Sequence, residues 1–149
     1  MSPASARLTA GDAGLEFGGV SIDTRTLAAG ELFVAIRGDR FDGAEFAAAA
    51  IEKGAGGVVV PHGWSGRRAP GAVVIEVDDT TAALQSLANA IRRESGTKVV
   101  AITGSAGKTT TKEITSELLA ARYRVIRNRG NFNNHIGLPL SLVELRITR

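Results

Sequence analysis

The sequence predicts an α/β protein, in which a small amino-terminal α/β domain (residues 1–97) is followed by the start of a parallel-sheet, phosphate-loop domain (residues 98–149). Two observations support this class. Short runs of β-branched residues alternate with helical segments along the chain, which is the pattern of β-α-β units. The segment Thr103–Thr111 contains a glycine turn between an apolar run and a helical segment, the order found in phosphate-binding loops.

Strands and helices are expected to alternate in the first domain. Strands are predicted for four apolar runs: Val20–Asp23, Glu31–Ile36, Gly57–Pro61 and Ala72–Val77. The alanine-rich segment Ala44–Lys53 is predicted to be a helix that ends at Gly54. A second helix is expected after Asp78 and Asp79, running to about Arg93, because apolar residues recur there at core-facing spacing.

The second domain is expected to begin with the elements around the glycine turn. A strand is predicted at Val99–Thr103, a helix at Thr109–Ala121 and a strand at Tyr123–Arg127, followed by an apolar helical run to Leu145. A parallel nucleotide-binding sheet usually has more strands than these two. The chain is therefore expected to be a fragment of a longer protein.

The glycine turn has the residue types that bind a nucleoside triphosphate. Backbone N–H groups that can approach phosphate oxygens belong to Gly104, Ser105, Ala106 and Gly107. Lys108 and Thr109 are the candidate catalytic residues, because an ammonium neutralises the outer phosphates and a hydroxyl ligates Mg²⁺. Thr110 is a candidate for a further hydroxyl contact. ATP and Mg²⁺ are thus the predicted cofactors; the alternatives are a flexible turn and hydroxyls that only cap the helix.

This loop is shorter than the general phosphate-loop pattern. That pattern places four residues between its first glycine and the Gly-Lys pair, and Ile102 occupies the position of that glycine here. The form in this chain is Gly-x-x-Gly-Lys-Thr. The loop alone is therefore a moderately specific signal.

Composition restricts the remaining classes. With 44% hydrophobic and 22% charged residues, the 149-residue chain is typical of a globular protein. The sequence has no cysteine, which excludes disulfides and thiolate chemistry and agrees with a cytoplasmic location. No apolar run reaches the roughly 20 residues that span a bilayer, and no secretory signal is visible, so membrane insertion is not expected.

The charge is distributed unevenly. Residues 1–97 carry 9 Lys and Arg against 12 Asp and Glu, whereas residues 98–149 carry 9 against 3. Nucleic-acid binding is one interpretation of the basic end, but its arginines alternate with apolar residues as on a strand edge. Attraction of an anionic nucleotide explains the charge, so no nucleic-acid partner is expected.

Three motifs in this order are similar to those of the Mur ligases, ATP-dependent amide-forming enzymes that add amino acids to the peptidoglycan precursor. The first motif comprises Ser21–Arg25, Gly30–Gly38 and Phe41–Phe46; the second is the short loop at 103–111. The third, Asn128–Leu142, is most similar to the branch of the family that adds D-alanyl-D-alanine. The tripeptide-forming branch remains an alternative.

The resemblance implies a reaction and two substrate-binding regions. A carboxylate of UDP-N-acetylmuramoyl-tripeptide would attack the γ-phosphate of ATP, and the amine of D-alanyl-D-alanine would displace phosphate from the acyl phosphate. Residues 1–97 would hold the UDP end, and residues 98–149 would begin the central ATPase domain. The candidates for UDP contact are Thr24, Arg25, Arg37, Asp42 and Gly43.

Each of these candidates has a structural alternative. An arginine can pair with a diphosphate and a carboxylate can accept from uracil N–H. Asp23, Arg25 and Asp42 could instead be turn residues that pair locally. Asn131 and Asn134 are candidates to position ATP or substrate, or could equally be left-handed turn residues. No role is predicted for the two histidines or for the single tryptophan.

The chain also departs from the family pattern. Ala44 stands where the family often has a histidine, and the family's Mg²⁺-binding glutamate, carbamylated lysine and carboxyl-terminal domain come later than Arg149. The 149 residues alone are therefore expected to be inactive and monomeric. Two other classes stay open: a phosphate-loop kinase or GTPase, which would not explain the motif at 21–46, and a non-catalytic nucleotide-binding module.

Overall fold

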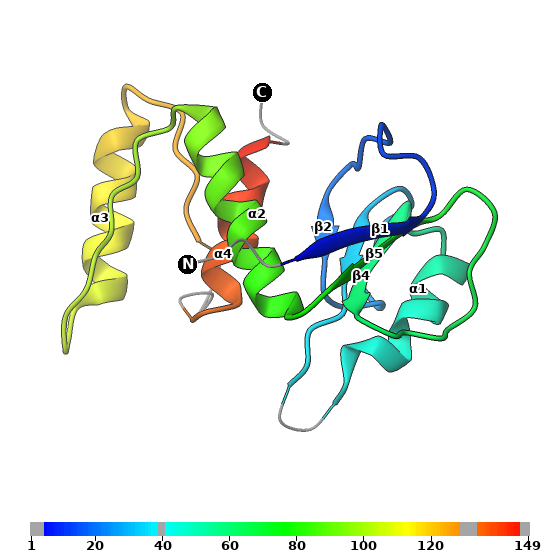
Figure 1. Cartoon of the computed structure of the whole chain (residues 1–149). Helices are drawn as coiled ribbons and strands as arrows, with labels where there is room; N and C mark the ends of the chain where they lie inside the picture. The colour runs from blue at the N-terminus through cyan, green and yellow to red at the C-terminus, as the bar shows by residue number, and fades with distance from the viewer. Residues whose placement is uncertain (1–4, 39–40, 129–133, 147–149) are drawn as a thin grey trace.

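The amino-terminal part of the protein is built on a mixed β-sheet. The computed structural model describes residues 5–38, 41–128 and 134–146. Within these residues the sheet has five strands in the order β1-β5-β4-β3-β2 (Figure 1). Its strands are β1 (Ala6–Ala10), β2 (Val20–Ser21), β3 (Leu32–Val34), β4 (Gly57–Pro61) and β5 (Val73–Val77). Strands β2 to β5 are parallel, and β1 pairs antiparallel with β5.

Helices lie on both sides of this sheet. The 3₁₀ helix η1 (Gly43–Phe46) leads into α1 (Ala47–Glu52), and the other helices are α2 (Thr80–Ser95), α3 (Lys108–Ala120), α4 (Gly137–Val143) and η2 (Glu144–Arg146). In Figure 1, α1 covers one side of the sheet, α2 and α4 lie together on the other, and α3 lies beyond them, away from the sheet. The predicted α/β class is confirmed, although the predicted helix at 44–53 begins with a 3₁₀ turn.

Alternation along the strands divides the core into two layers. Phe33 and Val58 point toward α1 and pack with its alanines. Leu32, Val34 and Val59 point to the opposite side, where they pack with Leu84 of α2. Because successive side chains of a strand point to opposite faces, an uninterrupted apolar run serves both layers.

Helix α2 is defined by local capping signals. The Asp79 carboxylate accepts hydrogen bonds from the backbone N–H groups of Thr81 and Ala82, at 2.8 and 3.0 Å. Gly96, with φ of +63°, ends the helix in the left-handed conformation. The hydroxyl of the buried Thr80 donates to the Ala35 carbonyl at 2.8 Å, which fixes the helix to the end of β3.

Segment 134–146 packs against α2. Val143 and Leu145 are buried with Ala88 and Ile91 of α2. The side-chain amide of Gln85 donates to the His135 carbonyl at 3.0 Å. A segment expected in the second domain thus shares a core with the last helix of the first, and the division after residue 97 stays a prediction.

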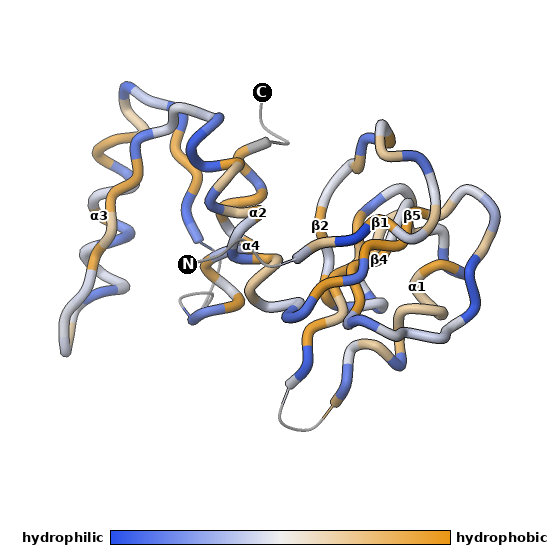
Figure 2. The backbone as a smooth tube through the Cα atoms, in the orientation of Figure 1, coloured by the Kyte–Doolittle hydropathy of each residue, from blue (hydrophilic) through white to orange (hydrophobic). Residues whose placement is uncertain are grey.

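Two of the predicted strands are wrong. Val99–Thr103 and Tyr123–Arg127 are irregular in the structure, and Val99 and Val100 are 50% and 63% exposed. A strand needs a neighbour for its ladder of hydrogen bonds, and two strands alone are marginally stable in water. Figure 2 shows hydrophobic colour along the segment that precedes α3. The predicted start of a second parallel sheet is therefore absent from the part of the chain that the structure describes.

One strand was not predicted. Strand β1 is short and largely exposed, and it pairs with β5 with Leu8 opposite Ile75. Its sequence, Ala-Arg-Leu-Thr-Ala, has little β-branched content, so the free edge of β5 rather than local preference decides this pairing. None of the helices that the structure describes is long and apolar enough to cross a membrane.

Candidate functional site

The glycine turn leads directly into the first turn of α3, whose backbone N–H groups are uncapped. Gly104 and Gly107 have φ of +154° and +77°, conformations that side-chain-bearing residues rarely adopt. Helix α3 begins at Lys108, directly after Gly107, and no side chain caps its first amides. These amides have no partner within the helix and lie at the positive end of its dipole. A glycine turn before an uncapped helix start is an arrangement that can bind an anion.

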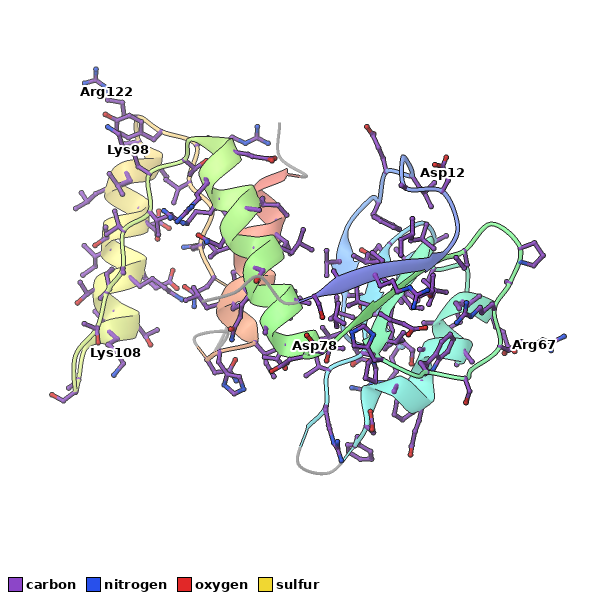
Figure 3. All side chains as sticks on the ribbon, viewed as in Figure 1. Asp12, Arg67, Asp78, Lys98, Lys108 and Arg122 are labelled. Carbon is purple, nitrogen blue, oxygen red and sulfur yellow. The ribbon has the colours of Figure 1, made fainter. Side chains whose placement is uncertain are left out.

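Lys108 lies over this turn. Its ammonium donates a hydrogen bond to the Gly104 carbonyl, so the side chain folds back toward the loop amides. Figure 3 shows Lys108 at the amino end of α3. Thr109 and Thr110, which follow it, are exposed. The loop thus combines amides, an ammonium and hydroxyls within one turn of backbone, as the sequence predicts.

The residues around the loop fit Mg²⁺ only together with phosphate. The described ranges contain no group of three His, Cys, Asp or Glu residues that could hold a metal ion. Mg²⁺ bound to nucleotides usually takes one or two protein ligands, and phosphate oxygens and water complete its octahedron. The exposed Thr109 hydroxyl at the helix start could supply one such ligand.

Three of the five residues proposed to contact UDP lie together at the carboxyl end of β3. Arg37 and Asp42 face each other in an antiparallel bridge. The Gly43 N–H donates to the Ile36 carbonyl at 3.0 Å. The Asp42 carboxylate accepts from the Ala44 N–H at 3.0 Å and starts η1. Asp42 therefore has a capping role in the fold, whatever it contacts in a ligand.

The other two, Thr24 and Arg25, lie in the turn after β2. The Arg25 guanidinium contacts the Asp23 carboxylate at 2.6 Å, and the Arg25 N–H donates to the same carboxylate at 2.9 Å. Local pairing within the turn, the alternative interpretation, is therefore observed. The Arg25 side chain is 86% exposed, and an exposed pair contributes little to stability, so the guanidinium can exchange partners.

This pair gives a testable pKa. Hydrogen bonds from the side chain and backbone of Arg25 lower the pKa of Asp23 from 3.8 to about 2. Because the folded-state pKa is lowered, the stabilisation is present above the unfolded pKa and is lost as the pH falls toward 2. Arg25→Gln should raise the pKa of Asp23 toward its ordinary value in an NMR titration. Arg67→Gln should leave it unchanged, and an unchanged pKa in Arg25→Gln would contradict the assignment.

Asn128 and Asn134, which the structure describes, each accept hydrogen bonds. The Lys112 ammonium lies 3.4 Å from the Asn128 carbonyl. The Asn134 side-chain oxygen accepts from the N–H groups of Ile136 and Gly137, at 3.2 and 2.6 Å. Asn134 thus starts α4, a structural role that the sequence did not distinguish from ligand binding. Asn131 lies outside the described residues.

Trp64 has a role that the sequence did not reveal. Its indole N–H donates to the Ala44 carbonyl at 3.1 Å, and its ring packs against the core beneath α1. The loop at 62–71 is thereby fastened to η1, beside the Arg37–Asp42 bridge. A lone tryptophan in a loop rich in glycine and proline is the one signal that could have indicated this anchor.

His62 lies between two carboxylates at the ends of β4 and β5. Its ring nitrogens are 3.7 Å from Glu76 and 3.2 Å from Asp78. The Gly63 N–H lowers the pKa of Glu76, and the Ser5 hydroxyl lowers that of Asp78. This cluster ties β1 to the strand ends, and residue spacing alone gave no sign of it.

Comparison with protein families assigns the chain. The family model described as "Mur ligase family, catalytic domain" matches residues 16–92, more than half of the chain, and "Mur ligase middle domain" matches residues 102–148. The chain belongs to the Mur ligase family. The alternative interpretation of the chain as a phosphate-loop kinase or GTPase is therefore wrong, and the family match supports the ligase class.

Two relatives within the family carry the name of the same ligase. The chain is 47% identical over 131 residues to UDP-N-acetylmuramoyl-tripeptide–D-alanyl-D-alanine ligase of Bacillus subtilis, covering 85% of this chain and 28% of that protein. It is 40% identical over 126 residues to the enzyme of the same name from Escherichia coli, covering 85% and 27%. The chain therefore spans little more than a quarter of the length of these relatives.

Solved structures agree with the fold. A crystal structure of MurF from Acinetobacter baumannii superimposes with a TM-score of 0.77 and 34% identity, covering 88% of this chain and 28% of that one. MurF ligase from Thermotoga maritima in complex with ADP superimposes with a TM-score of 0.69 and 33% identity, covering 84% and 28%.

Proposed function

We propose that this chain is the amino-terminal part of a UDP-N-acetylmuramoyl-tripeptide–D-alanyl-D-alanine ligase, an ATP-dependent enzyme of peptidoglycan synthesis. The observation that carries this proposal is the Gly104–Thr109 turn at the start of α3, in a chain whose relatives bear that name. The Thermotoga maritima MurF ligase, which this chain matches over 28% of its length, was solved in complex with ADP, and this supports the use of an adenine nucleotide.

In this proposal the loop residues position and neutralise the triphosphate. The amides at the start of α3 bind phosphate oxygens, and Lys108 leaves the Gly104 carbonyl to bind the outer phosphates. Mg²⁺ would neutralise charge on the same phosphates, with Thr109 as its protein ligand. The substrate carboxylate would then attack the γ-phosphorus, which breaks its bond to the β,γ-bridging oxygen, releases ADP and gives an acyl phosphate. The amine of D-alanyl-D-alanine would attack the acyl carbon, lose a proton and displace inorganic phosphate, which leaves the amide.

The UDP-sugar end would lie on the amino-terminal sheet. Arg37, Asp42 and Gly43 are already adjacent at the end of β3, and Arg25 is exposed in the turn after β2. Carboxyl ends of parallel strands are where α/β sheets bind ligands. Thr24 belongs to the same turn. We further propose that the domain division falls after residue 97 and that the protein acts in the cytoplasm as a monomer, without nucleic acid.

Each of two substitutions should weaken the binding of one ligand and spare the other. Lys108→Ala should weaken ATP binding at least tenfold, about 1.4 kcal/mol, and spare the UDP-muramoyl peptide. Arg25→Ala should weaken the UDP-muramoyl peptide and spare ATP, because its guanidinium pairs with a diphosphate. Titration calorimetry measures both, with Lys98→Ala as a control of the same chemical type. Unchanged ATP binding in Lys108→Ala would refute the phosphate role, and equal loss of both ligands would indicate misfolding.

A turnover assay separates the remaining alternatives. ATP-dependent phosphate release with UDP-muramoyl tripeptide and D-alanyl-D-alanine is expected from a full-length relative carrying this segment and not from the 149 residues alone. If phosphate release instead requires UDP-muramoyl dipeptide and a single amino acid, the result would favour the tripeptide-forming branch of the family. Release from the 149 residues alone would show that the chain is not merely a binding module.

A further inference from the structure

Lys53, at the carboxyl end of α1, contacts the turn that follows β2. Its ammonium donates a hydrogen bond to the Thr24 carbonyl at 2.8 Å, although the two residues lie 29 apart in the sequence. A second bond joins the same two segments, because the Gly30 N–H donates to the Gly54 carbonyl at 2.9 Å. The segment at 23–30 is therefore fastened to the end of α1, where a lysine also complements the helix dipole.

The bond from Lys53 acts on a single peptide group of this turn. The Thr24 carbonyl and the Arg25 N–H belong to the same planar unit. Its carbonyl accepts from Lys53, and its N–H donates to the Asp23 carboxylate at 2.9 Å. Hydrogen bonds at the two ends of one peptide group polarise it and strengthen each other. Together they fix the backbone from which the Arg25 side chain extends.

These backbone bonds do not depend on where the Arg25 guanidinium lies. The guanidinium belongs to a side chain that is 86% exposed, and it contacts the Asp23 carboxylate at 2.6 Å. If it moves to a diphosphate, Asp23 loses the side-chain hydrogen bond that lowers its pKa most. The charge of Lys53 also lowers the pKa of Asp23, so a cation remains beside the carboxylate after the guanidinium has left.

We propose that Lys53 is a positioning residue for the diphosphate of a UDP-linked substrate. It holds the peptide group between Thr24 and Arg25, so that the Arg25 guanidinium can leave Asp23 and pair with the diphosphate while the turn keeps its shape. Lys53 acts through Arg25 and does not itself bind phosphate. This inference rests on the proposed function, in which Arg25 contacts the UDP end of the substrate.

The test is a double-mutant cycle on the 149-residue chain, measured as UDP binding by titration calorimetry. Lys53→Met should weaken UDP binding about fivefold, as expected for the loss of one hydrogen bond from a charged donor. In the Arg25→Gln variant the same substitution should weaken it by less than about twofold, because no guanidinium is left to position. Lys53→Arg, which keeps the charge and the N–H donors, should restore binding. Lys98→Met removes another exposed lysine and should leave UDP binding unchanged.

The position of the guanidinium is measured separately by NMR titration of Asp23. The pKa of Asp23 should be higher in the UDP complex than in the free chain, because the guanidinium has moved to the diphosphate. An unchanged pKa would show that Arg25 stays on Asp23 and would overturn the inference.

The cycle distinguishes this inference from the proposed function. Equal losses from Lys53→Met in both backgrounds would show that Lys53 acts independently of Arg25, as a phosphate ligand or a stabiliser of the fold, and would overturn the positioning role. Unchanged binding in Lys53→Met, or no restoration by Lys53→Arg, would overturn it as well. Failure of the unmodified chain to bind UDP would instead refute the proposed function, and the positioning role with it.

Discussion

Gly43→Ala should lower the free energy of unfolding by about 3 kcal/mol, because the new methyl group has no space. A Cβ at this position would lie 2.5 Å from the Ile36 oxygen and 2.7 Å from the Ala35 carbonyl carbon. Both are backbone atoms at the end of β3, so no side-chain rotation can relieve the overlap. The same overlap would strain the hydrogen bond that the Gly43 N–H donates to the Ile36 carbonyl. Urea unfolding followed by circular dichroism measures the change.

The matched control is Gly18→Ala. A Cβ at Gly18 would meet no atom within 4 Å, so the substitution should change stability by less than about 0.5 kcal/mol. The comparison also separates two reasons for a glycine at position 43. If the residue serves only UDP contact, Gly43→Ala will fold normally and lose affinity for the UDP-muramoyl peptide. The structure favours the other reason, close backbone packing.

Phe33→Ala should cost about 4 kcal/mol, a large part of the roughly 5–15 kcal/mol that stabilises a typical domain. Phe33 is 1% exposed in the middle of β3, opposite Val58 of β4, and packs in the core under α1. Removing its ring leaves a cavity that the flanking strands cannot close without breaking their ladder. The midpoint of urea unfolding should fall, with little change in the slope.

Phe41→Ala is the control for this second experiment. It removes the same ring from a residue that is 70% exposed, so a change below about 0.5 kcal/mol is expected. A loss in Phe41→Ala as large as that in Phe33→Ala would mean that Phe41 is buried in solution. Equal stability of Phe33→Ala and the unmodified chain would contradict the position of β3 between β4 and β2 in the sheet.

Several elements could be predicted because their signals are local. Strand β4 coincides with the predicted Gly57–Pro61, since a valine run has strong strand preference and is buried on both faces. The helix after Asp79 was predicted from its cap, which forms as expected. The glycine turn before Lys108 was equally readable, because its positive φ angles need glycine wherever the loop lies.

Elements that depend on a distant partner could not be predicted in the same way. Strand β1 exists because the edge of β5 is free to pair with it, and Val99–Thr103 is not a strand because no described neighbour pairs with it. In both cases local composition points the wrong way. Long-range backbone pairing, not residue preference, makes the decision.

For the candidate site, the sequence by itself determined the residue types of the phosphate loop and its position before a helix. Only the tertiary structure fastened Trp64 to Ala44 and joined Thr80 to Ala35, pairs that lie 20 and 45 residues apart in the sequence. The physical reason is range: dihedral preferences and caps act within a few residues, whereas burial and backbone approach depend on segments that meet only in the folded chain.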